Sequence, residues 1–289
     1  MSKPSIYDRV TSKIVADLER GVRPWVRPWS AENLARQVSR PLRFNGEAYH
    51  GINVVTLWID AVCKGYRSAR WVTYKQAQEL GGQVRKGEQG SPVVYADRFM
   101  KKKQDGNGDE VAREIPFLKA YTVFNAEQVH GLPEEFYAAS SEPMAPGWSK
   151  HQTAENFVGL IAAVIKHGGL RAYYSEGTDH VQLPPRETFR DGESYYATLL
   201  HELTHWTKHA TRLDRDFGRK RFGDAGYATE ELVAELGAAF LCADLGITPE
   251  VRDDHAAYLS HWLDALRADS KAIFVAAAHA ERAAQYLGR

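Results

Sequence analysis

The segment Tyr195-Tyr-Ala-Thr-Leu-Leu-His-Glu-Leu-Thr-His-Trp206 decides how the C-terminal half of this chain folds. It contains no Gly or Pro, so we predict that it is helical. His201 and His205 are one helical turn apart and point to the same side, so both imidazoles can reach one metal ion. Glu202 follows the first histidine, where a carboxylate can take a proton from water activated by that metal. The spacing therefore predicts both a metal site and a hydrolytic reaction.

Chance matches to this short pattern occur on surface helices, but the residues around it favour a buried helix. Its neighbours include the apolar residues Leu199, Leu200, Leu203 and Trp206. Buried polar groups without partners are costly, so two histidines and a glutamate in such a helix need partners. A metal ion supplies them.

A catalytic zinc site needs three protein ligands and one open position. The candidates for the third ligand are His209, Asp214, Asp216, Glu230, Glu231 and Glu235. His209 lies about 80° around the helix from His201, so we expect it to be exposed or to cap the helix. The better candidates lie on the next predicted helix, Ala228–Leu245, which is rich in small and apolar residues.

Glu231 and Glu235 are one turn apart on that helix and face the same way. We predict that Glu231 is the ligand and that Glu235 accepts a hydrogen bond from the far nitrogen of a ligand histidine. The reverse order fits the same spacing. Glu230 is expected to be a solvated charge near the start of the helix.

Composition places the chain among soluble globular proteins. The residues are 44% hydrophobic and 26% charged. A chain of 289 residues is long enough for two domains. The sequence has no apolar run of about 18 residues and no apolar N-terminal segment, so neither a membrane span nor a signal peptide is expected. Two cysteines, Cys63 and Cys242, argue against a disulfide framework and a structural zinc finger. We expect a cytoplasmic protein.

The net charge of zero hides two halves of opposite sign. Residues 1–131 contain 21 Lys and Arg against 14 Asp and Glu, while the remaining 158 residues contain 16 against 23. A basic half is typical of a protein that binds a polyanion. We predict an α+β domain over 1–131, a proline-containing linker over 132–150 and a mostly helical domain over 151–289.

The pattern of apolar residues predicts the elements of both halves. In the first half, helices are expected at Ser5–Arg20, Ile52–Cys63 and Thr73–Leu80, and strands at Ser91–Phe99 and Pro116–Phe124, joined by a mobile polar loop over 101–110. In the second half, helices are expected at Gln152–His167, Asp254–Ala268 and Ser270–Leu287, and short strands at Ala172–Tyr174 and His180–Leu183.

Aromatic and basic residues alternate in the first half, which is typical of single-stranded DNA binding by base stacking in a positive groove. The candidate DNA-binding residues are Arg23, Trp25, Arg27, Trp29, Arg40, Arg43, Tyr49, Arg67, Arg70, Trp71, Arg85 and Lys86. The alternative is that many of these aromatic side chains belong to the hydrophobic core.

Two resemblances add to these predictions. The His-Glu-x-x-His pattern, with Glu231 and Glu235 on a second helix some 26 residues later, resembles the gluzincin metallopeptidases. Four longer phrases are similar to the antirestriction ArdC family. They are Arg40-Pro-Leu-Arg-Phe-Asn-Gly-Glu-Ala-Tyr-His-Gly-Ile-Asn-Val54, Gly81-Gly-Gln-Val-Arg-Lys-Gly-Glu88, Ala120-Tyr-Thr-Val-Phe-Asn125 and Glu230-Glu-Leu-Val-Ala-Glu-Leu-Gly-Ala-Ala-Phe-Leu-Cys242.

The ArdC resemblance implies an N-terminal domain that binds single-stranded DNA and a C-terminal zincin-like peptidase domain with Zn²⁺, or alternatively Mn²⁺. It also implies a plasmid-encoded protein that protects incoming conjugative DNA from host restriction. Two other hypotheses remain: a DNA-binding protein with a silent zincin domain, and a plain cytosolic peptidase. In the active case, strand His180–Leu183 is expected to pair with an extended substrate, and Tyr227 is a candidate for stabilising the oxyanion.

Overall fold

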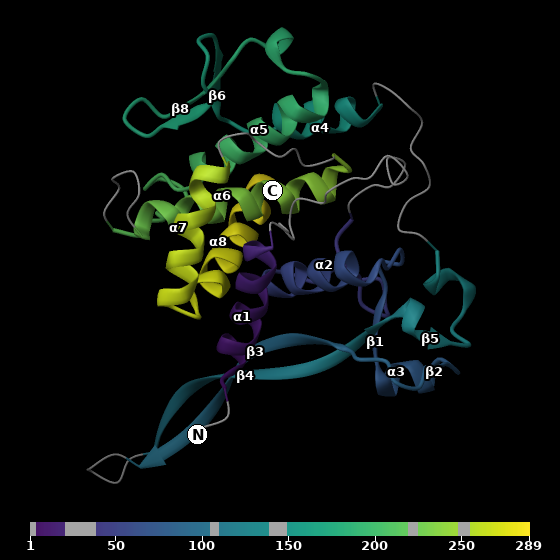
Figure 1. Ribbon diagram of the computed structural model, residues 1–289. Helices are drawn as coiled ribbons and strands as arrows, with labels where there is room; N and C mark the ends of the chain where they lie inside the picture. Colours follow the sequence, from purple (N-terminus) through teal and green to yellow (C-terminus); the bar gives the residue numbers. More distant parts are fainter. Residues whose placement is uncertain (1–3, 21–38, 105–109, 139–148, 219–224, 248–254) are drawn as a thin grey trace.

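The structure is a computed structural model that describes residues 4–20, 39–104, 110–138, 149–218, 225–247 and 255–289. The fold is α+β, as predicted, and Figure 1 shows its elements in chain order. The N-terminal half contains α1 (Ile6–Glu19), α2 (Ile52–Lys64), β1 (Trp71–Thr73), α3 (Tyr74–Glu79), β2 (Gln83–Val84), β3 (Ser91–Gln104), β4 (Glu110–Asn125) and β5 (Val129–His130). The C-terminal half contains α4 (Ser149–Gly159), β6 (Val164–His167), β7 (Tyr173–Ser175), β8 (His180–Leu183), α5 (Gly192–Trp206), α6 (Ala225–Leu245), α7 (His255–Ala268) and α8 (Ala272–Leu287).

The strands form three small sheets, with orders β1-β4-β3, β2-β5 and β6-β8-β7. The antiparallel pair β3 and β4 is the longest, and it extends away from the helices at the foot of Figure 1. Above the helices in that view, β8 runs between parallel β6 and antiparallel β7. The β1-β4-β3 sheet and the β6-β8-β7 sheet thus lie at opposite ends of a central group of helices.

Two predicted elements were wrong in part. The helix expected to run to His167 ends at Gly159, and residues 164–167 instead form β6, which pairs in register with His180–Leu183 of β8. A long-range strand pairing therefore overrides the local helical pattern. Residues 101–104 and Glu110 of the expected loop also belong to strands, because Lys101–Lys103 pair with Val111–Arg113 in the β3–β4 hairpin, and residues 105–109 of that loop lie outside the described residues. The polar composition of this stretch does not prevent backbone pairing.

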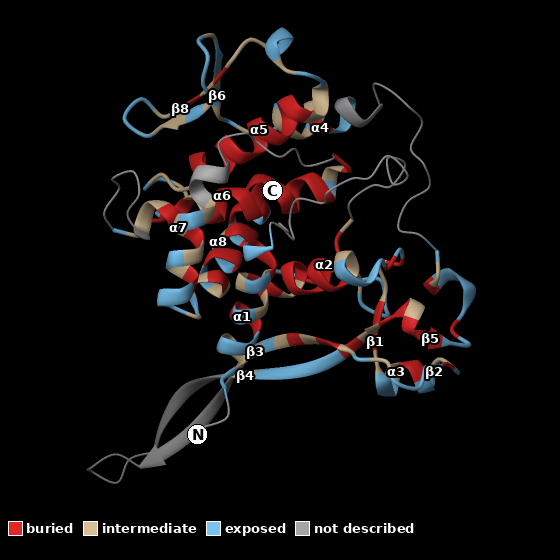
Figure 2. Cartoon of the chain, viewed as in Figure 1, coloured by how far each residue is buried: buried red, intermediate tan, exposed pale blue. Residues whose placement is uncertain are grey.

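The main hydrophobic core joins the two halves of the chain. Helices α1 and α2 pack against α7 and α8, and their apolar residues belong to one buried cluster with α5 and α6 (Figure 2). A smaller cluster fills the space between α3, β1, β2 and β5. It includes Leu132 and Phe136, so the start of the predicted linker packs on the N-terminal half. The proposed boundary at residue 131 remains a prediction.

Close packing between α5 and α6 brings the candidate metal ligands together. A Cβ atom added at Gly237 of α6 would lie 2.6 Å from Cγ2 and 2.9 Å from Oγ1 of Thr204 on α5. Thr204 is fully buried, and its hydroxyl donates a hydrogen bond to the carbonyl of Leu200. The absence of a side chain at Gly237 therefore lets the two helices approach each other.

We expect Gly237→Ala to destabilise the protein by about 1–3 kcal/mol, because the new methyl group overpacks a rigid contact. It should also weaken metal binding, since it pushes α6 away from the histidines. Gly159→Ala is the control, because nothing lies within 4 Å of a Cβ at that position. Urea unfolding of both variants tests the prediction, which is wrong if the two are equally stable.

Candidate metal centre

Helix α5 presents the two histidines from a buried position. It begins at a capping box in which the side chain of Asp191 accepts a hydrogen bond from the Ser194 amide at 2.8 Å. Such a cap satisfies backbone donors that the first turn leaves unpaired. His201, Glu202 and His205 are 4%, 3% and 7% exposed, so the helix is buried as its apolar flanks predicted.

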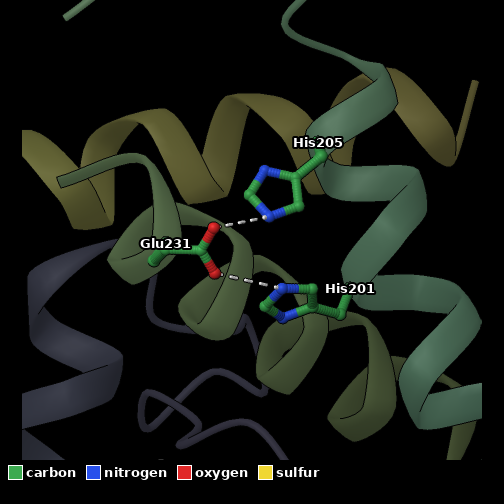
Figure 3. Close-up of side chains that lie close together, drawn as sticks. All are labelled: His201, His205 and Glu231. Carbon is green, nitrogen blue, oxygen red and sulfur yellow. Dashed lines mark ion pairs between the residues drawn. The ribbon is translucent and has the colours of Figure 1, made fainter. Parts of the chain in front are cut away.

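The carboxylate of Glu231 on α6 lies between the two imidazole rings (Figure 3). Its Oε2 is 3.6 Å from Nε2 of His201, and its Oε1 is 3.6 Å from Nε2 of His205. Ligands about 2.1 Å from a tetrahedral ion lie about 3.4 Å from one another. Two imidazoles and one carboxylate at this spacing fit a single divalent ion. Among the described residues, these three are the only group of His, Cys, Asp and Glu side chains clustered in this way.

A second carboxylate lies behind each histidine. Oε1 of Glu235 is 3.4 Å from Nδ1 of His201, and Oε1 of Glu230 is 3.0 Å from Nδ1 of His205. The prediction that Glu230 is a solvated charge was therefore wrong, because this residue is 9% exposed. It forms an ion pair at 2.7 Å with Arg215, a residue whose place in the site no sequence pattern indicated.

The charges of the cluster determine which groups are ionised. Burial alone would raise the pKa of Glu231, but His205 and His201 outweigh it and hold the pKa well below its usual value. Burial likewise opposes ionisation of Glu230, yet Arg215 and His205 lower its pKa to about 2. Burial favours the neutral ring of His205, but Glu231 and Glu230 raise the pKa of that histidine. Glu230 and Glu231 are therefore ionised, and their negative charge favours a bound cation.

The other candidate ligands lie outside this cluster. Nδ1 of His209 accepts hydrogen bonds from the hydroxyl and the amide of Thr211, at 2.8 and 3.2 Å, within the turn after α5. Asp216 accepts a hydrogen bond from the Gly218 amide at 2.9 Å and lines the pocket. Asp214 has a positive φ of 45° and shapes the same turn.

A pocket of about 950 Å³ opens onto the cluster. Glu202 lines it together with the candidate ligands, Tyr227 and the segment from Leu170 to Tyr174. The strand expected to bind substrate, His180–Leu183, was the wrong one, because β6 and β7 occupy both of its edges. Strand β7 lies at the edge of the sheet and contributes Tyr173 and Tyr174 to the pocket, so it can offer its backbone to an extended chain.

The structure divides the predicted DNA-binding residues into three sets. Arg23, Trp25, Arg27 and Trp29 lie outside the described residues. Arg43, Arg67, Arg70, Arg85 and Lys86 are exposed or half-buried. Arg40, Tyr49 and Trp71 are 8%, 8% and 1% exposed, which contradicts their assignment to a DNA surface.

Arg40 and Trp71 are buried for different physical reasons. The guanidinium of Arg40 contacts Asp244 at 2.6 Å and Glu281 at 2.7 Å, so it joins the N-terminal half to α6 and α8. The ring of Trp71 packs edge-on against Tyr66, 5.9 Å between centroids. Arg40 therefore holds the two halves together. Trp71 fills the core, as the alternative hypothesis for the aromatic residues expected.

The buried helix pair, the mixed sheet above it and the two-histidine, one-glutamate cluster define the C-terminal half as a zincin-like metallopeptidase fold. Residues 152–279 match the model of the zincin-like metallopeptidase family, and residues 4–124 match that of the N-terminal domain of anti-restriction factor ArdC. The chain belongs to the antirestriction ArdC family. Membership in a zincin-like family implies a metal ion, without deciding between zinc and manganese.

Relatives of known structure cover almost the whole chain. The antirestriction ArdC protein of plasmid R388 has a metal-free crystal structure that is 46% identical, with a TM-score of 0.80 over 98% of this chain and 97% of that one. Its Mn(II)-bound structure is 44% identical, with a TM-score of 0.78 and the same coverage.

Two further relatives were found by sequence. The Sinorhizobium fredii protein y4eC is 43% identical over 98% of this chain and 91% of its own length. A DNA primase TraC of Escherichia coli is 38% identical over 97% of this chain, which spans only 27% of that primase. Sequences like this one therefore also occur as part of a much longer protein.

Proposed function

We propose that this protein is a metal-dependent peptidase whose N-terminal half binds single-stranded DNA, and that it protects incoming conjugative DNA from host restriction. The observation that carries the peptidase part is the position of Glu202 beside His201, His205 and Glu231 in one pocket. Family membership supports the antirestriction part. We propose that the ion is Zn²⁺, because two imidazoles and one carboxylate are ligands that zinc commonly takes, with Mn²⁺ as the alternative that one relative supports.

The chain's own residues perform most of the proposed reaction. A bound divalent ion would supply Lewis acidity, and His201, His205 and Glu231 would hold it. Glu202 would take a proton on its carboxylate from the attacking water and return it to the nitrogen of the leaving amine. The outer edge of β7 would bind the substrate backbone by strand addition. Tyr227 lines the same pocket and remains the candidate for stabilising the oxyanion.

The proposed DNA surface uses residues that remain accessible. Arg43, Arg67, Arg70, Arg85 and Lys86 supply positive charge. Tyr95 and Tyr121 are 49% and 47% exposed on neighbouring strands and follow the same face of the β3–β4 hairpin, with Lys119 paired opposite Tyr95. Exposed aromatic rings beside a cation are the groups on which bases stack. We propose these tyrosines in place of the buried Tyr49 and Trp71.

Binding to a single-stranded oligonucleotide is expected to weaken steeply with salt. Five phosphate contacts would give a slope of about −3.5 in a plot of log affinity against log salt. Fluorescence anisotropy at several salt concentrations measures this slope, and Lys86→Ala should reduce its magnitude by about 0.7. Glu187→Ala, a change at an exposed residue near α5, is the control. A slope near zero would favour the hypothesis of a plain peptidase.

No helix in the described ranges is long and apolar enough to cross a bilayer. Cys63 and Cys242 are free thiols. Together with the DNA-binding proposal, these thiols support a cytoplasmic location.

A further inference from the structure

The turn that follows α5 contains an arginine that reaches back to Glu230, the carboxylate behind the candidate metal ligand His205. Nε of Arg215 donates to Oε2 of Glu230 at 2.7 Å, and NH2 of Arg215 donates to Oε1 at 2.8 Å. Oε1 of Glu230 is also the atom 3.0 Å from Nδ1 of His205. A buried chain of contacts therefore runs from Arg215 through Glu230 to His205.

Other contacts fix Arg215 itself. Its NH1 donates to the hydroxyl of Thr207 at 3.0 Å, and its NH2 donates to the carbonyl of Thr204 at 2.9 Å. The side chain is 0% exposed. Every nitrogen of the guanidinium thus has a partner, which leaves it one orientation. Because Thr204 belongs to α5 and Thr207 is the residue that caps its C-terminal end, the arginine is fixed relative to the helix that carries His205.

We propose that Arg215 and Glu230 are positioning residues for the metal site, and that they act as a clamp which orients the His205 ring and keeps its Nε2 free to bind the ion. The proposal rests on the proposed metal site. A carboxylate on Nδ1 selects the tautomer that has its proton on that nitrogen. Arg215 holds the carboxylate in place through two parallel hydrogen bonds, a geometry that lysine cannot reproduce. The same clamp also holds the pocket wall, because Asp216 and Phe217 directly follow Arg215 and line the pocket.

A second arginine in the same turn is a matched control. The side chain of Arg212 is also buried, at 7% exposure, and it also contacts a carboxylate twice, with NH2 and NH1 at 2.5 and 3.0 Å from the oxygens of Asp179. Its guanidinium packs 3.9 Å above the ring of Trp206. Arg212 also donates to the carbonyl of Trp206 at 2.6 Å and to the hydroxyl of Tyr174 at 3.1 Å, and none of these contacts is with the side chain of His201, His205 or Glu231. Loss of Arg212 therefore tests the effect of removing a buried arginine from this turn.

The experiment measures the dissociation constants of Zn²⁺ and Mn²⁺ by competition with a chromophoric chelator. The variants are Glu230→Gln, Arg215→Met, Arg215→Lys, the double variant of the first two, and Arg212→Met. We expect Glu230→Gln and Arg215→Met each to weaken binding about 10–100-fold. Arg215→Lys should recover part of that loss. Arg212→Met should bind within about threefold of the wild type.

The double variant shows whether Arg215 acts through Glu230. If it does, the double variant should bind metal no more than about threefold more weakly than Glu230→Gln. Both single changes then remove the same interaction, so their effects on metal affinity do not add. Thermal unfolding of the metal-free forms measures how each change affects stability. Arg215→Met and Arg212→Met should both lower the Tm, so a loss of metal affinity that occurs only in Arg215→Met does not come from a loss of stability.

Three results would overturn the inference. It fails if the Glu230 and Arg215 variants bind metal like the wild type, if Arg212→Met weakens binding as much as Arg215→Met, or if the two losses multiply in the double variant. A wild-type chain that binds neither ion would remove the proposed function, and the inference with it. Failure of the clamp inference can therefore be distinguished from failure of the proposed metal site.

Discussion

Replacing Glu202 with Gln is expected to abolish peptide hydrolysis while the metal stays bound. The amide keeps the shape of the side chain but cannot take a proton from water, and loss of such a base costs about 10²–10⁴-fold in rate. Glu202 is 3% exposed and lines the pocket beside the candidate ligands, so the change removes a proton acceptor without opening the site. Cleavage of a labelled denatured protein, followed with excess Zn²⁺ or Mn²⁺, measures the effect.

The same variant separates the competing functions. Metal content and affinity for single-stranded DNA should match the wild type, and Glu187→Gln, at an exposed position, is the control for activity. Plasmid transfer into a restricting host then shows whether proteolysis is needed for protection. Loss of protection would support a peptidase that acts in antirestriction. Unchanged protection would favour a DNA-binding protein with a silent zincin domain, and unchanged cleavage would contradict the role of Glu202.

Replacing Glu231 with Ala is expected to weaken metal binding by about a thousandfold. Structural zinc sites bind with up to about 16 kcal/mol through four ligands, so one ligand contributes about 4 kcal/mol. The carboxylate of Glu231 is the group that lies 3.6 Å from Nε2 of each histidine. Its loss should leave two imidazoles that cannot hold the ion at micromolar concentration.

Glu235→Ala is the matched comparison for this prediction. Glu235 contacts Nδ1 of His201, the nitrogen that faces away from the proposed ion. Its loss should therefore weaken metal binding only about 10–100-fold. Chelator competition on both variants measures the two effects. A larger loss for Glu235→Ala than for Glu231→Ala would mean that the reverse order, which the spacing alone also allows, is correct.

Much of the candidate site could be predicted from local patterns. The spacing of His201 and His205 requires only a regular helix, and α5 is one. The spacing of Glu231 and Glu235 on a second helix placed both carboxylates on the face toward α5. These predictions depend on helical geometry, which the local sequence specifies strongly, and the structure brings all four side chains together.

Other features depend on contacts between distant segments. β6 forms because residues 164–167 pair with β8. The pattern of apolar residues within this segment does not indicate that pairing. Burial of Arg40 depends on Asp244 and Glu281, more than 200 residues away. The burial of Glu230 had a usable signal: Gly237 lies seven residues later, about two turns along the same face, and packs against Thr204. A glycine and a glutamate on one helix face are a pattern from which a close and buried contact could have been predicted there.

The most direct test of the account is anomalous diffraction from crystals of this protein grown with Zn²⁺, and separately with Mn²⁺, recorded at each metal's absorption edge. We predict a single strong peak about 2.0–2.2 Å from Nε2 of His201, Nε2 of His205 and a carboxylate oxygen of Glu231. The peak should vanish in crystals of Glu231→Ala. No peak at this position with either metal, or one coordinated by neither histidine, would contradict the proposed metal centre.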